Sequence, residues 1–325
     1  MNAPLVLDAD AVRAACTPAM AVEAVTAALN SGADPAADLP RQAVPVRSGH
    51  FLLMPSEGAR SGAHVGVKVA TVAPENPARG LPRIQASYLL FDAESLSLVA
   101  TLDGTALTTL RTPAVSVAAV APRLQAGSGP VALAVLGAGP QAHGHVATLA
   151  SVLGSQRQLG PVTYLVREPA KVTPSEGAQV VPLGGQRAGD VLRAANVVVC
   201  ATSARSPLFD DGLIADSAVV IAVGSHEPDA RELPGTLCAR ATVVVEDVAT
   251  ALREAGDVCM AVDDGALRAA HLVSMREVVT GHALPDPGRP LVFKSVGMSW
   301  EDLVVAEAVL GGHSTAVNTS PKNSV

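Results

Sequence analysis

The sequence has few aromatic side chains and little charge. Phe, Trp and Tyr make up 2% of its 325 residues, and Asp, Glu, Lys and Arg make up 16%, with a formal net charge of −7. Nucleic-acid binding usually needs a positive surface for the phosphates and aromatic rings for the bases. An acidic chain with few rings therefore predicts no nucleic-acid partner.

Long apolar runs and paired cysteines are also missing. Stretches such as 197–201 and 219–223 are far shorter than the roughly 20 residues of a membrane-spanning helix. The first ten residues show no basic segment followed by an apolar run, so we expect no targeting peptide. Four scattered cysteines lack metal-ligand spacing and are expected to be reduced thiols. These absences predict no membrane partner, no metal site and a cytoplasmic location.

Hydrophobic residues make up 49% of the chain, enough for the cores of two domains. Thr17-Pro18 resembles the start of a helix, and apolar residues recur at helical spacing up to Asn30. Short β-like runs follow, which predict an antiparallel or mixed sheet: 51–54, 66–72, 84–91 and 98–102. A further helical stretch opens at 103–105, and Pro113 is expected to interrupt it, with Thr112 capping a new helix.

Beyond residue 130 the pattern alternates between strands and helices. Five β-rich runs are separated by segments of helix length: 131–136, 162–166, 197–200, 219–223 and 242–245. This alternation is typical of a doubly wound parallel sheet, the Rossmann type of α/β fold. Another strand is expected near 291–293 and a helix up to Leu310, whereas 311–325 are expected to be disordered.

A glycine-rich segment follows the run 131–136 and precedes a helix predicted over 141–153. Gly137 permits a tight turn, Gly139 lets the backbone approach a pyrophosphate, and Ala142 allows close helix packing. The helix N-terminus attracts the anion. A simple tight turn between strand and helix is the alternative. The predicted cofactor-binding residues here are Gly137, Ala138, Gly139, Pro140, Gln141 and Ala142.

The end of the second strand of this unit bears on the choice of dinucleotide. NAD-binding proteins usually have an acidic residue there, but this sequence has Arg167, with Lys171 close behind. Both cations could hold a 2′-phosphate, so the residues favour NADPH. Glu168 keeps NADH possible, and two solvated surface cations are the alternative.

Three cations stand in or near the N-terminal part, namely Arg41, Lys68 and Arg111. Arg111 lies among apolar residues, a setting in which a guanidinium often reaches into a cleft and pairs with a carboxylate. From the residues alone, ordinary surface ion pairs explain the three cations equally well.

Several motifs together resemble the ornithine cyclodeaminase/mu-crystallin family. They occur in the family's order over nearly the whole chain: Gly66-Val67-Lys68-Val69, Asn76-Pro77-Ala78-Arg79-Gly80-Leu81-Pro82, Leu102-Asp103-Gly104-Thr105, Leu110-Arg111-Thr112, the glycine-rich segment and Phe293-Lys294-Ser295-Val296-Gly297. The resemblance implies a homodimer. Each protomer would have an α+β substrate-binding and dimerisation domain, 1–118 and 291–325, and a Rossmann domain, 119–290.

The resemblance also implies roles for single residues. Arg41, Lys68 and Arg111 would bind the substrate carboxylate. The implied cofactor contacts, besides the glycine-rich segment, are Thr112, Ala201, Thr202, Ser203, Val223, Gly224, Lys294, Val296 and Gly297.

One position departs from the cyclodeaminases that the sequence resembles. His226 stands where those enzymes have an aspartate that handles protons, whereas the Pro-Asp-x-Arg-Glu-Leu segment after it looks like the mu-crystallin and imine-reductase branch. We therefore expect an NADPH-dependent reductase of cyclic ketimine acids, with Lys68 or His226 keeping the imine protonated. Ornithine or lysine cyclodeaminase, amino acid dehydrogenase and a non-enzymatic ligand-binding protein are the alternatives.

Overall fold

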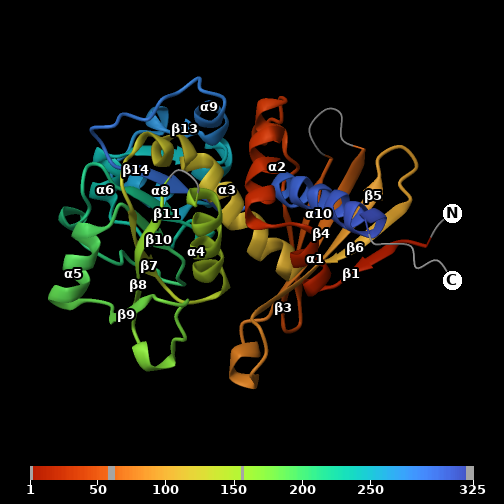
Figure 1. Ribbon diagram of the computed structural model, residues 1–325, viewed down its shortest axis with the longest axis horizontal. Helices are drawn as coiled ribbons and strands as arrows, with labels where there is room; N and C mark the ends of the chain where they lie inside the picture. The colour runs from red at the N-terminus through yellow and green to blue at the C-terminus, as the bar shows by residue number, and fades with distance from the viewer. Residues whose placement is uncertain (1–2, 58–62, 155–156, 320–325) are drawn as a thin grey trace. The chain divides into compact units, whose positions relative to one another are not determined.

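A computed structural model describes residues 3–57, 63–154 and 157–319 (Figure 1). Contacts divide the chain into two compact units, which we call unit 1 (up to Thr112 and from Met298) and unit 2 (Pro113–Gly297). The expected boundaries were 118/119 and 290/291. They differ because a long helix runs through the first boundary, and because the strand after residue 290 is hydrogen-bonded inside the sheet of unit 2.

Unit 1 contains a six-stranded sheet in the order β1-β6-β5-β4-β3-β2. Its strands are β1 (Leu5–Leu7), β2 (Gln42–Val46), β3 (Gly49–Ser56), β4 (His64–Val72), β5 (Ile84–Asp92) and β6 (Leu98–Asp103). β1 pairs parallel with β6 and the other pairs are antiparallel, which confirms the mixed sheet. Along β4 every second residue from Gly66 to Val72 is buried, so Lys68 lies on the inner face.

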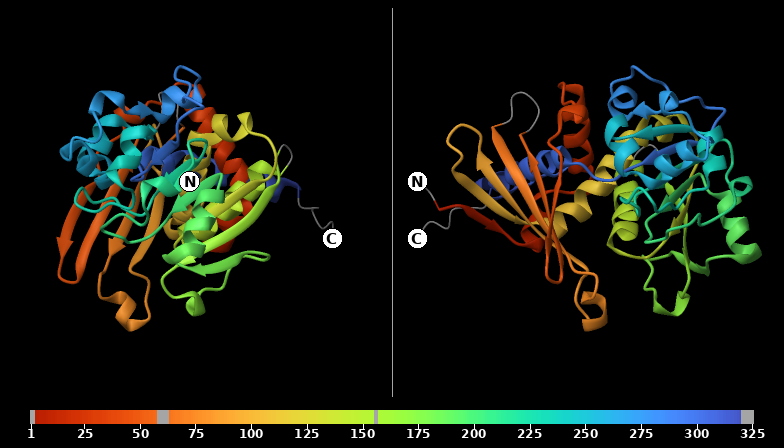
Figure 2. Two further views of the ribbon diagram at one scale, coloured as in Figure 1. Left: turned by 90° about the vertical axis from the view of Figure 1, so that its left-hand side faces the viewer. Right: turned by 180° about the vertical axis from the view of Figure 1, so that it is seen from behind.

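Helices of unit 1 pack on this inner face: α1 (Ala9–Ala15), α2 (Pro18–Asn30) and α10 (Ser299–Thr319). Thr17 caps α2 as predicted, its hydroxyl accepting from the Met20 amide. α10 contacts α1, α2, β3 and β4 (Figures 1 and 2). Among the described residues no single helix is long and apolar enough to cross a membrane, and the pair α1 and α2, which passes by length and composition only, is bent by 70°.

The expectation of disorder beyond residue 310 is wrong for 311–319, which continue α10. Close packing explains this result, because a side chain at Gly312 would overlap the carbonyl oxygen of Ala15. A glycine that lowers helix propensity thus lets α10 approach the end of α1. Residues 320–325 lie outside the described residues.

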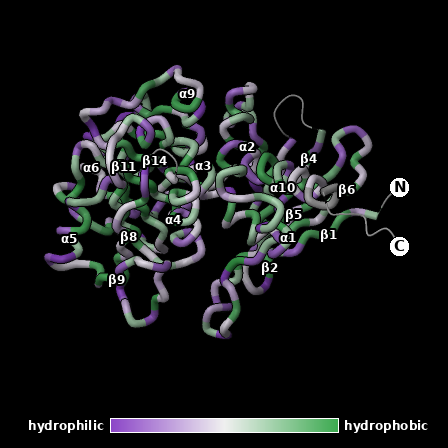
Figure 3. The backbone as a smooth tube through the Cα atoms, in the orientation of Figure 1, coloured by the Kyte–Doolittle hydropathy of each residue, from purple (hydrophilic) through white to green (hydrophobic). Residues whose placement is uncertain are grey.

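Unit 2 contains an eight-stranded, fully parallel sheet in the order β13-β12-β14-β11-β10-β7-β8-β9. Its strands are β7 (Val131–Leu136), β8 (Leu159–Val166), β9 (Gln179–Pro182), β10 (Val197–Cys200), β11 (Val219–Ala222), β12 (Thr242–Val245), β13 (Val273–Ser274) and β14 (Leu291–Lys294). The central strands are buried along their length and mostly hydrophobic (Figure 3). The predicted doubly wound sheet is confirmed.

Helices cover both faces of this sheet. Residues of α5, α6, α7 and α8 form one core with one face of the central strands, and α3 and α4 cover the other face (Figure 1). The helices are α3 (Gly104–Ala126), α4 (Pro140–Leu153), α5 (Gly185–Ala194), α6 (Gly235–Arg240), α7 (Val248–Glu254), α8 (Gly256–Asp263) and α9 (Met275–Val279). Short 3-10 helices span Pro35–Ala37, Asn76–Arg79, Pro169–Lys171, Asp211–Leu213 and Ala269–His271.

The predicted helix break at Pro113 is wrong, because α3 runs through it without interruption. Proline removes one backbone hydrogen bond, which usually kinks or ends a helix. Here residues 111–120 are all buried, so packing around the helix outweighs the lost bond. Arg111 and Thr112 therefore lie in the middle of a rigid helix rather than at a helix start.

Candidate active site

A buried cluster of charges forms the centre of unit 1. Lys68 comes from β4, Arg111 from α3, and two carboxylates come from the first turn of α10. Lys68 Nζ lies 2.6 Å from Asp302 Oδ2. Arg111 Nη1 lies 2.5 Å from Glu301 Oε2, and its Nε lies 3.2 Å from Asp302 Oδ1. Asp302 thus bridges the two predicted substrate-binding cations.

Burial decides the electrostatics of this cluster. Lys68 and Arg111 are 3% and 5% exposed, whereas Glu301 and Asp302 are completely buried. Burial lowers the pKa of Lys68 to about 8, an effect that Asp302 opposes and Arg111 reinforces. Two cations facing two carboxylates make the cluster close to neutral, which is how charges become tolerable away from water.

Sequence reasoning found the two cations but missed Glu301 and Asp302. A usable signal was present, because the two acidic residues directly precede a largely apolar stretch, 303–310, whose residues Leu303, Val305, Ala306 and Val309 are buried. A carboxylate at the start of a buried helix requires a cationic or hydrogen-bonding partner. The motif ending at Gly297 stands just before them in the chain.

The start of α10 is fixed by Asp38. Its Oδ2 accepts hydrogen bonds from the backbone N–H of Ser299 at 2.7 Å and of Trp300 at 3.1 Å. Burial raises the pKa of Asp38 to about 6, although these hydrogen bonds act in the opposite direction. Arg41, the third predicted cation, is half-buried and directly precedes β2. Its contact with the substrate stays a prediction.

Unit 2 has the strand, glycine loop and helix arrangement that a dinucleotide site requires. Gly137 has a φ of 104° and lies so close to the Ala201 carbonyl that a side chain would not fit. Gly139 is the N-cap of α4 and has open space in front of it, while Ala142 is fully buried against the sheet. Backbone donors at this helix start can therefore face an anion.

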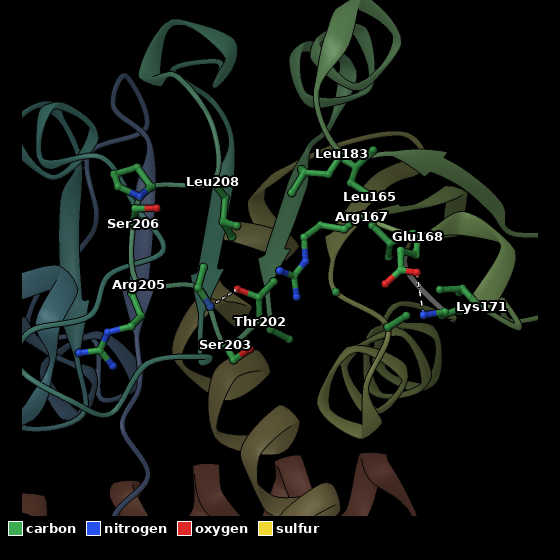
Figure 4. Close-up of a pocket in the computed structure, with 17 residues that line it drawn as sticks. Leu165, Arg167, Glu168, Lys171, Leu183, Thr202, Ser203, Arg205, Ser206 and Leu208 are labelled. Carbon is green, nitrogen blue, oxygen red and sulfur yellow. Dashed lines mark hydrogen bonds and ion pairs between the residues drawn. The ribbon is translucent and has the colours of Figure 1, made fainter. Parts of the chain in front are cut away.

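A pocket of about 720 Å³ adjoins the glycine loop (Figure 4). The ends of β7, β8 and β10 line it, and this volume is typical of small-molecule sites. The side chain of Arg167 extends across the pocket toward Thr202, whereas Arg205 points away (Figure 4). Lys171 and Glu168 face each other, with Nζ and Oε2 2.7 Å apart. The two predicted phosphate ligands thus differ, because Lys171 forms an ion pair with a carboxylate, whereas Arg167 extends into the pocket.

Buried carboxylates hold the other predicted cofactor-binding segments. Glu246 accepts hydrogen bonds from Ser295 Oγ and from the backbone N–H of Val296 and Gly297. Glu232 accepts hydrogen bonds from the backbone N–H and the hydroxyl of Thr202 and from the backbone N–H of Gly224. Neither carboxylate was singled out from the sequence, although Glu232 belongs to the Pro-Asp-x-Arg-Glu-Leu segment.

Lys294 is one of the cofactor contacts that the resemblance implies, and this contact stays a prediction. Its side chain is completely buried, and its Nζ lies 2.6 Å from the Ser225 carbonyl oxygen and 3.0 Å from Asp257 Oδ2. The ammonium therefore binds a backbone carbonyl and a carboxylate of the protein itself. His226, next to Ser225, is exposed in the loop after β11. Its role in proton transfer stays a prediction.

Comparison with known proteins assigns the family. The model of the ornithine cyclodeaminase/mu-crystallin family matches residues 3–313. The chain belongs to this family. Within it, the chain is 33% identical to the ketimine reductase mu-crystallin of Mus musculus, over 90% of this chain and 91% of the relative.

One further relative and one solved structure are named as reductases of cyclic imino acids. The Δ1-pyrroline-2-carboxylate/Δ1-piperideine-2-carboxylate reductase of Azospirillum brasilense is 31% identical over 81% of each chain. A solved structure of Thermococcus litoralis Δ1-pyrroline-2-carboxylate reductase, in complex with NADH and L-proline, aligns with a TM-score of 0.84 at 25% identity. That alignment covers 96% of this chain and 98% of the other.

Proposed function

We propose that this protein is an NAD(P)H-dependent reductase of cyclic ketimine acids, which converts Δ1-pyrroline-2-carboxylate or Δ1-piperideine-2-carboxylate to L-proline or L-pipecolate. The observation that carries the proposal is the buried cluster of Lys68, Arg111, Glu301 and Asp302, in a chain that also has a dinucleotide-binding unit. The names of the relatives at 31% and 33% identity support this substrate class.

The charge balance suggests how the acid is bound. Lys68 and Arg111 are already matched by Asp302 and Glu301, so a substrate carboxylate would give the cluster an excess negative charge. Arg41 supplies the third positive charge that restores the balance. A bidentate guanidinium–carboxylate contact fixes the orientation of the acid as well as its position. Binding and positioning are the main catalytic contribution of these cations.

Protons are the second contribution of the cluster. An iminium accepts a hydride more readily than a neutral imine, and the bound nicotinamide supplies that hydride. Lys68 has a pKa of about 8, so near neutral pH it is still mostly protonated yet can donate to the imine nitrogen. Asp302, in contact with Lys68 Nζ, stabilises the charged form of this lysine. His226 is the alternative donor.

The residues of unit 2 fit a dinucleotide, with NADPH favoured over NADH. The glycine loop leaves open space in front of the N-terminus of α4, and Arg167 reaches into the adjoining pocket. Arg167 would pair with the 2′-phosphate, whereas Lys171 would have to leave Glu168 to do so. We expect Arg167 to dominate the preference.

The test is a pair of assays on the purified protein. NADPH oxidation is measured with each cyclic ketimine acid, and ammonia release is measured with L-ornithine and L-lysine. NADPH consumption without ammonia release is the expected result. Ammonia release without net change in the cofactor would overturn the proposal and indicate a cyclodeaminase.

We further propose that two copies associate through the outer face of the unit 1 sheet. Within the described part of unit 1, α1 and α10 contact the sheet from its inner face, and no helix covers the outer one (Figure 2). Val6, Val44, Val46 and Phe51 on the outer face are 79%, 41%, 47% and 37% exposed. Exposed apolar residues gathered on one face of a sheet often mark an interface.

Sedimentation tests this interface. Phe51→Glu places a charge on the outer face and should shift the protein from dimer to monomer. Leu284→Glu, at an 81% exposed position of unit 2, is the control and should leave the dimer intact. A dimer that survives Phe51→Glu at micromolar concentration would refute the outer face as the interface.

A cytoplasmic location is proposed with this function. All four cysteines are free thiols, and Cys16, Cys200 and Cys238 are buried. Free thiols are typical of reducing compartments, where disulfides are rare.

A further inference from the structure

Three buried charged residues of unit 2 have no part in the proposed chemistry. Glu232 is completely buried, and Asp257 and Lys294 are 2% and 1% exposed. They come from three different places: the loop before α6, the first turn of α8 and the end of β14. Charges at this depth carry a large desolvation cost, so their hydrogen bonds show what they stabilise.

Glu232 holds two loops at a fixed separation. Its Oε1 accepts from the backbone N–H of Thr202 at 2.8 Å and from the Thr202 hydroxyl at 2.7 Å, and its Oε2 accepts from the Gly224 N–H at 2.7 Å. The two loops follow the neighbouring parallel strands β10 and β11. The fit is close, because a side chain at Gly224 would overlap both Glu232 and the Thr202 carbonyl.

Asp257 and Lys294 extend this contact to the next residue of the second loop. Asp257 Oδ1 accepts from the backbone N–H of Glu232 at 2.7 Å and of Leu233 at 2.8 Å. Its Oδ2 lies 3.0 Å from Lys294 Nζ, which donates to the Ser225 carbonyl oxygen at 2.6 Å. The contacts therefore close into a ring through Glu232, Asp257, Lys294, Ser225 and Gly224, and Thr202 is joined to this ring through Glu232.

The place of this ring in the sheet indicates which half of a dinucleotide it affects. In doubly wound sheets the ligand lies at the carboxyl ends of the strands, across the point where the strand order reverses. β7 carries the glycine loop, with β8 and β9 on one side of it and β10 and β11 on the other. The pocket with Arg167, on the adenosine side, is lined by the ends of β7 and β8 and by the loop after β10, whereas the loop 224–226 after β11 is not part of its lining.

We propose that Glu232, Asp257 and Lys294 are positioning residues that hold loop 224–226 at a fixed place beside loop 201–203, for the nicotinamide half of the cofactor. The proposal rests on the proposed function, because it assumes that NAD(P)H binds to unit 2. None of the three side chains has to touch the cofactor. Glu232 and Lys294 act on backbone groups of the loops, and Asp257 contacts both Glu232 and Lys294. A small displacement of the reacting ring costs a large factor in rate.

Direct binding measurements on Glu232→Gln test the proposal. The amide retains the shape of the carboxylate, but it turns one acceptor into a donor facing Thr202 or Gly224. We expect the Kd for NADPH, measured by fluorescence, to rise about 10-fold, the effect of one lost charged hydrogen bond. The Kd for 2′,5′-ADP, which lacks the nicotinamide half, should change less than about 2-fold on the same scale.

Two further variants complete the experiment. Arg231→Gln is the matched control, because Arg231 precedes Glu232 but pairs with Asp264 outside the ring; it should leave both Kd values unchanged. Thr202→Val is a milder change, since it removes only the hydroxyl hydrogen bond to Glu232 and keeps the backbone one, and it should show a smaller loss of the same selectivity. It replaces Glu232→Gln if that variant does not fold.

Equal weakening of NADPH and 2′,5′-ADP would overturn the proposal, because the ring would then support the whole unit rather than two loops. Unchanged NADPH binding would overturn it as well. Failure of the wild-type protein to bind either ligand is a different result, since it contradicts the proposed function itself.

Discussion

The two buried charge clusters use the same residue types for different purposes. In unit 1, Glu301 and Asp302 contact the charged groups of Arg111 and Lys68. In unit 2, Glu232 and Glu246 accept mainly from backbone N–H groups of loops. Carboxylates that neutralise cations prepare a site for another ion, whereas carboxylates that bind backbone fix the shape of a site.

This difference predicts different consequences of mutation. Changes in the unit 1 cluster should alter binding of the acid and the pH dependence of the reaction. Changes in the unit 2 network should alter cofactor geometry and leave the pH dependence unaffected.

The largest effect is expected from Arg111→Met, which removes one cation and leaves Glu301 and Asp302 buried. We expect a loss of about 3–5 kcal/mol in the free energy of unfolding and a fall in kcat/KM of about 10³-fold or more. Arg111→Lys retains the charge and should recover part of both losses. Denaturant unfolding and steady-state kinetics measure them, and a fully active Arg111→Met would contradict the site.

Arg167→Ser should produce the next largest effect. Loss of a guanidinium–phosphate contact is expected to raise the KM for NADPH about 10- to 100-fold, with little change for NADH. Lys171→Ser is the comparison variant, and its effect should be smaller because Lys171 already pairs with Glu168. Equal effects of the two variants would contradict the arrangement in Figure 4.

Asp302→Asn tests the pH dependence. Asp302 raises the pKa of Lys68, so its loss should lower that pKa below about 8. If protonated Lys68 is required, kcat/KM falls as pH rises through this pKa. In the variant the pKa is lower, so this fall in kcat/KM should begin at a lower pH than in the wild-type protein. At pH 8 we expect a reduction of about 3- to 10-fold.

Two observations accompany that pH profile. Because the folded-state pKa of Lys68 lies below its usual 10.5, its contribution to stability should increase between about pH 8 and 10.5. Glu232→Gln in unit 2 should leave the alkaline limb of the profile in place. If the alkaline limb moved in both Asp302→Asn and Glu232→Gln, the pH dependence would not be specific to the unit 1 cluster.

The smallest effect is expected at Asp38, which caps α10. Asp38→Ala should lower the free energy of unfolding by about 1 kcal/mol, the usual cost of a lost N-cap. Asp38→Asn should cost less, because its side-chain oxygen still accepts from Ser299 and Trp300. Thermal unfolding distinguishes the two, and equal losses would show that the charge rather than the acceptor stabilises α10.

The sequence predicted the fold well where periodicity is strong and local. β7, β10 and β12 begin and end where the apolar runs do, because buried parallel strands are continuous apolar segments. Pro113 misled the prediction because burial of α3 outweighs a local propensity. The helix over 311–319 was predicted to be disordered, because the packing of Gly312 on Ala15 joins residues about 300 positions apart and no local pattern shows such a contact.

Some residues of the candidate site could also be predicted from the sequence, and others could not. Lys68 and Arg111 were found through motifs, and the structure buries both. Glu301 and Asp302 were missed although an apolar stretch follows them, whereas Glu232 was missed because no local pattern separates its buried position from a solvated one. Only tertiary contacts with Lys68, Arg111 and Thr202 reveal their importance.

Isotope transfer shows whether the protein moves a hydride from NADPH to the imine carbon of a cyclic ketimine acid. The protein is incubated with Δ1-piperideine-2-carboxylate and NADPH that carries deuterium at the transferable position of the nicotinamide, and the product is analysed by mass spectrometry. The expected product is L-pipecolate with one deuterium at the carbon next to the carboxylate. Unlabelled pipecolate, or no amino acid product under conditions in which NADPH binds, would contradict it.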